Sequence, residues 1–287
     1  MQIVAAAAQK TFKAVRKDTQ LRLGLIGMFT LLFFVVFAPI LAPADPYDFG
    51  VHSLSAPGQD GHLLGSNHMG QDVLSMLIYG VQTSLAVAII SALISGALGV
   101  LIGGVAGYFG GRIDFYISEF TNVFMMLPTF FLILLIVALF GNSLFNVMVV
   151  IGLTTWPSNA KLMRAQALSL RERTFVKGAI AMGETKPQIL FKYIVPNGIF
   201  PVIANTTIGM SNAILTEAGL SFLGLGDPNV ISWGQMIQTG SRYITSAWWV
   251  SAFAGLAIVY TVVVFYLLGD GLNHVLNPKH LYRKGAA

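Results

Sequence analysis

Cysteine is absent from the chain and charged residues are scarce. With no cysteine among the 287 residues, neither disulfides nor thiolate metal sites can form. Only 10% of the residues are charged, whereas 55% are hydrophobic, and the mean hydropathy is +0.72. This balance lies far outside the range of an ordinary soluble domain. The composition therefore predicts an integral membrane protein.

Sequence motifs of catalysis are also missing. The chain contains no Gly-Lys dipeptide, which excludes the phosphate-binding loop G-x-x-x-x-G-K-[ST]. It has no H-E-x-x-H and no G-x-S-x-G either. We therefore expect no enzymatic activity, no catalytic residue and no bound cofactor in this chain. His52, His62 and His68 share one polar loop, but their irregular spacing favours ordinary surface histidines over a metal site.

Six apolar stretches are long enough to cross a bilayer. A hydrocarbon core of roughly 30 Å needs about 20 apolar residues per helix. The stretches are residues 23–41, 83–106, 115–140, 145–163, 199–218 and 248–268. They are apolar on nearly every side, whereas membrane β-strands would alternate strictly. We predict an all-α polytopic membrane protein with six transmembrane helices.

Few ionisable side chains interrupt these stretches. Glu119 and Glu217 lie near span ends, and Asp114 and Asp270 lie at the edges. A proton-coupled transporter would need such groups deep in the bilayer, where they are costly and functional. We favour interfacial or helix-to-helix hydrogen-bonding roles over a proton relay, which leaves a mostly neutral path through the membrane.

The basic residues predict the orientation. Every Lys and Arg except Arg242 precedes the first stretch, lies between the second and third or near the fourth and fifth, or follows the sixth. Positive loops stay in the cytoplasm, so both termini are predicted to be cytoplasmic. The predicted parts are an N-terminal segment (1–22), a membrane domain (23–270) with outer loops 42–80 and 219–247 and a cytoplasmic loop 168–197, and a tail (271–287). The net charge of +5 then reflects topology and anionic lipid, and we expect no nucleic-acid partner.

The cytoplasmic loop has the pattern of a helical hairpin. Gly183 suits the left-handed position that ends a helix, and Thr185 with Pro187 supplies a cap and a helix start. Apolar residues recur at helical spacing among lysines on both sides of Gly183. The segment 175–197 is therefore predicted to be two short helices that lie against another surface.

A ridge of small residues runs along the second stretch. Its members follow one another at intervals of four: Ser91, Ser95, Gly99, Gly103, Gly107 and Gly111. Such a ridge lets another helix approach closely, either within this subunit or on a partner subunit. Pro128 and Pro157 should kink the third and fourth helices.

These features resemble the permease subunits of type I ABC importers. A cytoplasmic hairpin with Gly183 and Pro196, between the fourth and fifth spans, resembles the EAA loop of that family. LLGSNHMGQDVLSMLIYG (63–80) and EAGLSFLGLGDPNVISWGQMI (217–237) resemble segments of its dipeptide, oligopeptide and nickel branch. APILAP in the first span and LNPKH in the tail are similar to the smaller, C-type subunit of that branch.

The resemblance implies a set of partners in a prokaryotic inner membrane. These are a homologous B-type permease, two subunits that bind ATP and Mg, and an extracytoplasmic protein that delivers a peptide, nickel or an oligosaccharide. It also implies that the hairpin docks on an ATP-binding subunit. The expected contact residues are Glu172, Phe175, Lys177, Gly178, Ala179, Met182, Gly183, Glu184, Pro187 and Leu190. A secondary transporter or channel without an ATPase, or a membrane scaffold, is the alternative.

Two departures from the family pattern stand out. Lys177, Gly178 and Ala179 occupy the place of the usual Glu-Ala-Ala. Glu172 is the nearest acidic residue that could compensate for the missing carboxylate. In the outer segment, Asn67 and Gln71 replace the usual Asp and Arg. The hairpin is expected to keep its shape, because its glycine and prolines are retained.

Overall fold

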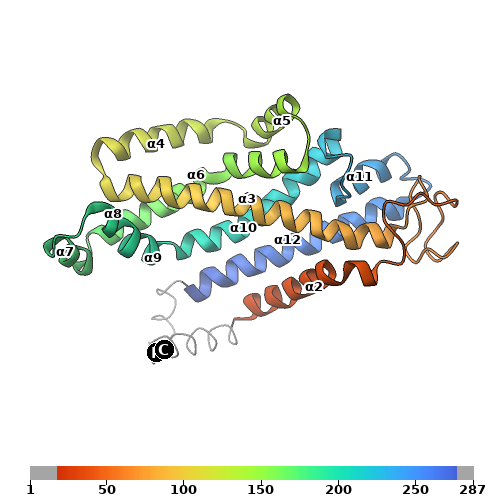
Figure 1. Cartoon of the computed structure of the whole chain (residues 1–287), viewed down its shortest axis with the longest axis horizontal. Coiled ribbons are helices and arrows are strands. Elements are labelled where there is room, and N and C mark those ends of the chain that lie inside the picture. Colours follow the sequence, from red (N-terminus) through yellow and green to blue (C-terminus); the bar gives the residue numbers. More distant parts are fainter. Residues whose placement is uncertain (1–17, 277–287) are drawn as a thin grey trace.

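The computed structural model describes residues 18–276, which form a long bundle of helices (Figure 1). Within these residues every regular element is a helix, and only two isolated β-bridges occur, both in the outer loop. Most of the predicted N-terminal segment 1–22 and of the tail 271–287 lies outside the described residues. The predicted all-α fold is confirmed.

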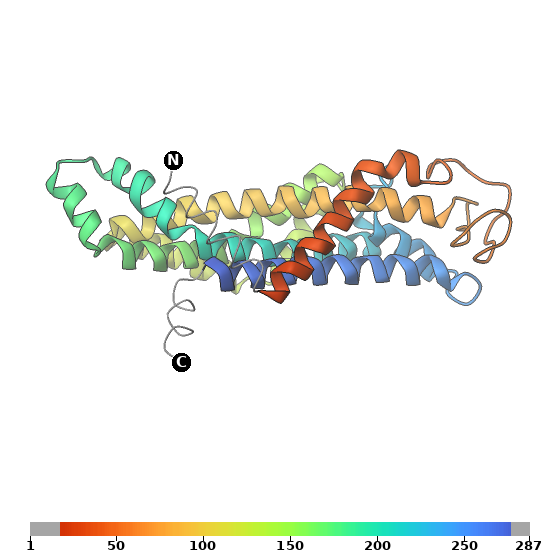
Figure 2. The ribbon, with the colours of Figure 1, turned by 90° about the horizontal axis from the view of Figure 1, so that it is seen from below.

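The elements follow one another along the chain as α-helices and two short π-helices, η1 and η2. They are α2 (Thr19–Leu41), α3 (Val73–Phe109), α4 (Gly111–Met126), α5 (Thr129–Phe140), α6 (Leu144–Arg171), α7 (Thr174–Ala181), α8 (Lys186–Ile189), η1 (Leu190–Ile194), α9 (Val195–Gly198), α10 (Phe200–Leu220), η2 (Ser221–Leu225), α11 (Trp233–Ser241) and α12 (Trp248–Leu276). The outer loop before α3 and the hairpin from α7 to α9 lie at opposite ends of the bundle (Figures 1 and 2).

Among the described residues, fewer helices qualify as candidate membrane spans than the six that the sequence predicts. Among the described helices, α2, α3, α10 with η2, and α12 are long and apolar enough to cross a membrane. If the bent pair α4 and α5 counts as one span, the number of candidate spans rises from four to five. Helix α6, which occupies the predicted fourth span, is not among them, because Lys161, Arg164 and many hydroxyl and amide side chains reduce its apolar character. A multi-pass helical protein is thus established, and the count of six stays a prediction.

Pro128 breaks the third stretch rather than merely kinking it. Helices α4 and α5 differ in direction by 82°. The residue before a proline is pushed out of the helical region, and Leu127 is extended, with φ −75° and ψ 130°. Pro157 behaves differently, because α6 continues through it from Leu144 to Arg171.

The small-residue ridge of α3 packs on α6 of the same subunit. Ser91 Oγ donates a hydrogen bond to the Met148 carbonyl at 2.9 Å. A Cβ atom on Gly99, Gly103 or Gly107 would collide with α6. The atoms in its way belong to Asn159, Ala160, Arg164 and Ala167, and most of them are backbone atoms. The predicted ridge from Ser91 to Gly107 therefore brings two helices of one chain into close contact. Gly111 is not part of it, because α3 ends at Phe109 and Gly111 begins α4 with a φ of +55°.

An ion pair fixes α4 to the half of α6 that leads into the hairpin. Both guanidinium donors Nε and Nη2 of Arg164 reach the Asp114 carboxylate, and the Nη2–Oδ2 distance is 2.7 Å. Two parallel N–H···O bonds of this kind fix orientation as well as distance. Helix α4 is thereby held in its first turn, and the break at Pro128 separates its other end from α5.

Substitution of Gly103 tests the α3–α6 contact. We expect Gly103→Ala to lower the free energy of unfolding by about 1–3 kcal/mol, because the added methyl group overpacks against the Ala160 backbone. Thermal unfolding in detergent measures the effect. Gly255→Ala is the matched control, since its Cβ would meet no atom within 4 Å. Equal melting temperatures for the two variants would contradict the close contact.

Candidate functional site

The hairpin between α6 and α10 has the turn that its sequence predicts. Gly183 has a φ of +82°, and its N–H donates to the Ile180 carbonyl at 3.0 Å. The next N–H, that of Glu184, donates to the Ala179 carbonyl at 3.2 Å. This pair of bonds is the Schellman arrangement that ends a helix on a left-handed residue. Helix α7 therefore stops sharply and the chain reverses.

The second arm of the hairpin, which consists of α8 and η1, begins at the helix N-cap Thr185. The backbone N–H of Thr185 donates to Gln188 Oε1 at 2.9 Å, and its hydroxyl donates to the same oxygen at 2.8 Å. Pro187 occupies the first turn of α8, where its missing N–H costs nothing. The turn is thus fixed on both sides of Gly183.

One face of the hairpin is apolar and packs against the helical bundle. The buried residues of this cluster are Val176 and Ala179 in α7, Ile189, Leu190 and Ile194 in the second arm, Met163 and Ala167 in α6, and Val202 in α10. Two predicted contact residues, Ala179 and Leu190, therefore face the bundle. Their burial stabilises the hairpin and leaves partner contact to the opposite face.

The opposite face carries exposed apolar side chains. Phe175 is 44% exposed and Met182 is 74% exposed, and Gly178, Gly183 and Pro187 are exposed beside them. Ile180 and Phe191 extend this face and were not among the predicted contact residues. The π-helical turn at η1 obscures Phe191 in the sequence, because it interrupts the 3.6-residue periodicity. Exposed apolar side chains that gather on an otherwise polar hairpin mark an interaction surface.

Glu184 ties the turn to the second arm. Its Oε1 accepts a hydrogen bond from the Tyr193 hydroxyl at 2.6 Å and from Lys192 Nζ at 2.9 Å. The Tyr193 hydrogen bond, followed by that of Lys192, lowers the pKa of Glu184 below its usual value. The turn therefore carries an ionised carboxylate with two donors, which restricts its movement relative to η1.

The residues that depart from the family pattern have partners in this chain. Lys177 Nζ lies 3.3 Å from the Glu172 carboxylate, an exposed pair with a contribution of about 0–1 kcal/mol. Asn67 Nδ2 donates to Gln71 Oε1 at 2.8 Å, and Gln71 Nε2 donates to the Pro46 carbonyl at 3.0 Å. Both amides are buried. A neutral pair thus holds the outer loop together.

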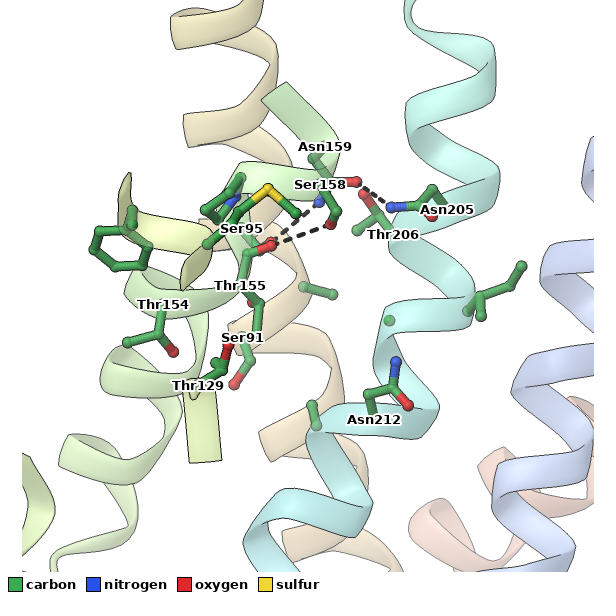
Figure 3. A pocket seen from close by; sticks show the side chains of 17 residues that line it. Ser91, Ser95, Thr129, Thr154, Thr155, Ser158, Asn159, Asn205, Thr206 and Asn212 are labelled. Carbon is green, nitrogen blue, oxygen red and sulfur yellow. Dashed lines mark hydrogen bonds between the residues drawn. The ribbon is translucent and has the colours of Figure 1, made fainter. Parts of the chain in front are cut away.

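A polar pocket of about 350 Å³ lies inside the bundle (Figure 3). Helices α3, α5, α6 and α10 line it with hydroxyl and amide side chains, whereas α4 contributes only Phe124 and Met125. The hydroxyl and amide side chains are those of Ser91, Ser95, Thr129, Thr154, Thr155, Ser158, Asn159, Asn205, Thr206 and Asn212. Its remaining lining residues are apolar or glycine, so every lining side chain is neutral. Such a lining can bind a solute through hydrogen bonds, without a fixed charge.

A chain of hydrogen bonds crosses this pocket. Asn205 Nδ2 donates to Asn159 Oδ1 at 2.8 Å, and Asn159 Nδ2 donates to Ser95 Oγ at 3.0 Å. The three side chains come from α10, α6 and α3. Ser95 was predicted as a packing residue of the ridge, and the sequence pointed to no substrate-binding residue. Polar residues at helical spacing in α6 and α10 were the available signal, but only the fold brings them together.

This architecture, with a projecting helical hairpin and a neutral pocket inside a membrane bundle, is that of a transport permease. Residues 99–281 match the family described as binding-protein-dependent transport system inner membrane component, and the chain belongs to that family.

Curated relatives and a solved structure agree with this assignment. The chain is 34% identical to the dipeptide permease DppC of Alkalihalophilus pseudofirmus, covering 94% of this chain and 90% of that protein. It is 36% identical to the di/tripeptide permease DppC of Pseudomonas aeruginosa (89% and 87% covered). It is 33% identical to the oligopeptide permease OppC of Haemophilus influenzae (89% and 83%). A structure of the MetNI methionine ABC transporter in inward-facing conformations shares the fold, with a TM-score of 0.56 and 19% identity over 70% of this chain and 96% of that one.

These relatives confirm the resemblance to C-type permeases of the dipeptide and oligopeptide branch. The protein is a membrane-embedded permease subunit of a binding-protein-dependent transport system.

Removal of the Tyr193 hydroxyl tests the Glu184 contact. A lowered pKa means that the carboxylate contributes stability above its ordinary pKa of 4.5 and loses it as the pH falls through the lowered value. In Tyr193→Phe we expect the pKa of Glu184 to rise toward 4.5, so hairpin opening starts at a higher pH. Hydrogen exchange of hairpin amides between about pH 7 and pH 3 measures the shift. Tyr116→Phe, on an exposed ring of α4, is the control, and identical profiles for both variants would contradict the contact.

Proposed function

We propose that this chain forms half of the translocation path of an ATP-driven importer for peptides, paired with a homologous B-type permease. One observation carries the proposal: a rigid hairpin with an exposed apolar face is connected directly to α6 and α10, two helices that line the polar pocket. The names of the relatives, which are dipeptide and oligopeptide permeases, support peptides as the solute.

In this proposal the hairpin faces the cytoplasm and the loops at the opposite end face outward, in a prokaryotic inner membrane with both termini inside. The basic residues around the hairpin support this orientation. An extracytoplasmic binding protein delivers the solute to the outer end, where a second cavity of about 470 Å³ lies between the outer loop and residues 221–239. Specificity then resides largely in that binding protein.

Separate subunits supply the energy. Two ATP-binding partners hold ATP and Mg, one of them seated on the exposed hairpin face, and this chain binds neither. Closure of the ATP-binding pair displaces the hairpin. Because the hairpin shares a buried apolar cluster with α6, and Arg164 joins α6 to Asp114 on α4, the displacement reaches two walls of the pocket. The pocket then changes its exposure from one side of the membrane to the other.

Chemical cross-linking tests where the hairpin docks. The chain has no cysteine, so Met182→Cys places a single thiol on the exposed face. We expect it to form a disulfide or a bifunctional-reagent cross-link with an ATP-binding subunit of the assembled complex. Met126→Cys, equally exposed but on α4, is the control and should give no such product. Cross-linking of both variants to the same degree, or of neither, would contradict the proposed docking face.

Substitutions at Gly183 test whether the hairpin transmits movement of the ATP-binding subunits to the pocket. With φ at +82° and open space around its Cβ position, Gly183→Val strains only the backbone, at about 1–3 kcal/mol. We expect membrane insertion to be retained, while transport per ATP hydrolysed falls several-fold in reconstituted vesicles. Gly183→Asn is the matched control, because Asn tolerates this conformation. Wild-type coupling in the Val variant would contradict transmission through this turn.

A further inference from the structure

The polar pocket combines fixed and unengaged hydrogen-bonding groups. Asn159 is 3% exposed, and its amide is oriented by Ser95 on one side and Asn205 on the other. This leaves the carbonyl oxygen of Asn205 without a hydrogen-bond partner among the described residues. A donor group of a solute could reach that oxygen without disrupting the Asn159 contacts.

Thr206 supplies an unsatisfied group at the same place. Its Oγ1 is buried and has no hydrogen-bond partner among the described residues. An unsatisfied buried hydroxyl is costly, so a solute group that reached Thr206 would gain a hydrogen bond that the described residues do not supply. Asn212, two helical turns further along α10, also lines the pocket; its side chain is exposed, so its amide is accessible to a solute. Figure 3 shows Asn205, Thr206 and Asn212 together on α10.

We infer that this pocket is a transient binding site for the main-chain amide groups of a peptide, an inference that rests on the proposed transport function. A peptide bond offers an N–H donor and a carbonyl acceptor, and an Asn side chain presents a complementary carbonyl oxygen and an NH2 group with two donors. A volume of about 350 Å³ lies at the lower end of the range for small-ligand sites. The pocket therefore holds a short stretch of peptide.

Because its lining is neutral, the pocket does not select for charged groups of a solute. No lining side chain is charged, so neither the ammonium nor the carboxylate end of a peptide gains an ion pair there. Contacts to the main chain alone accept many side chains and stay weak enough for release. A nickel ion, in contrast, requires imidazole, carboxylate or thiolate ligands, which this lining does not contain. The site thus favours peptides over a free cation.

Introduction of a charge tests this inference. Asn212→Asp changes one atom of the side chain and adds a carboxylate to the pocket. In vesicles with the complete importer and its binding protein, we expect uptake of a dipeptide with two acidic side chains to fall about tenfold relative to one with two lysines. Asn273→Asp is the matched control, because Asn273 is exposed on α12 and outside the pocket. It should leave that ratio unchanged.

A second substitution removes a hydrogen-bonding group without adding charge. Thr206→Val is isosteric, and we expect a several-fold rise in the peptide concentration for half-maximal uptake, with an unchanged melting temperature. If Asn212→Asp keeps the wild-type ratio, or if the wild-type complex imports oligosaccharides but no peptide, the inference is overturned. If the wild-type complex shows no ATP-dependent uptake of any solute, the proposed function itself is overturned.

Discussion

The close approach of α3 and α6 is the contact on which the rest of the molecule depends. In a bilayer, helices gain little from hydrophobic association, so backbone proximity and interhelical hydrogen bonds hold them together. Gly99, Gly103 and Gly107 provide that proximity. The same contact brings Asn159 to Ser95 in the pocket. One glycine ridge therefore sets the geometry of the pocket and positions the helix that continues into the hairpin.

Helix α6 links the two functional regions physically. It begins near the outer cavity, contributes Thr154 to Asn159 to the pocket, and continues to the start of the hairpin. Its second half, from Thr154 to Arg171, is the polar one, so the helix as a whole is not apolar enough to count as a candidate span. An uninterrupted helix transmits displacement better than a jointed one, whereas the α4–α5 break at Pro128 permits local rearrangement on the opposite wall.

Local features of the sequence predicted the hairpin well. Gly183, Thr185 and Pro187 determine their own backbone geometry, so the turn and the cap required no knowledge of the fold. The α4–α5 break was anticipated only as a kink, because sequence alone does not set its angle. The pocket could not be predicted, since residues 91–95, 154–159 and 205–212 meet only after the helices pack. For the same reason the sequence could not decide which helix would cover the ridge.

The buried amide pair of Asn67 and Gln71 distinguishes the outer loop of this protein. The attraction between opposite charges weakens as ionic strength rises, whereas hydrogen bonds between neutral groups do not depend on screening. The contact between these two buried side chains is therefore insensitive to salt and carries no titrating group. The segment before α3 thus keeps the geometry that this pair sets at both low and high ionic strength.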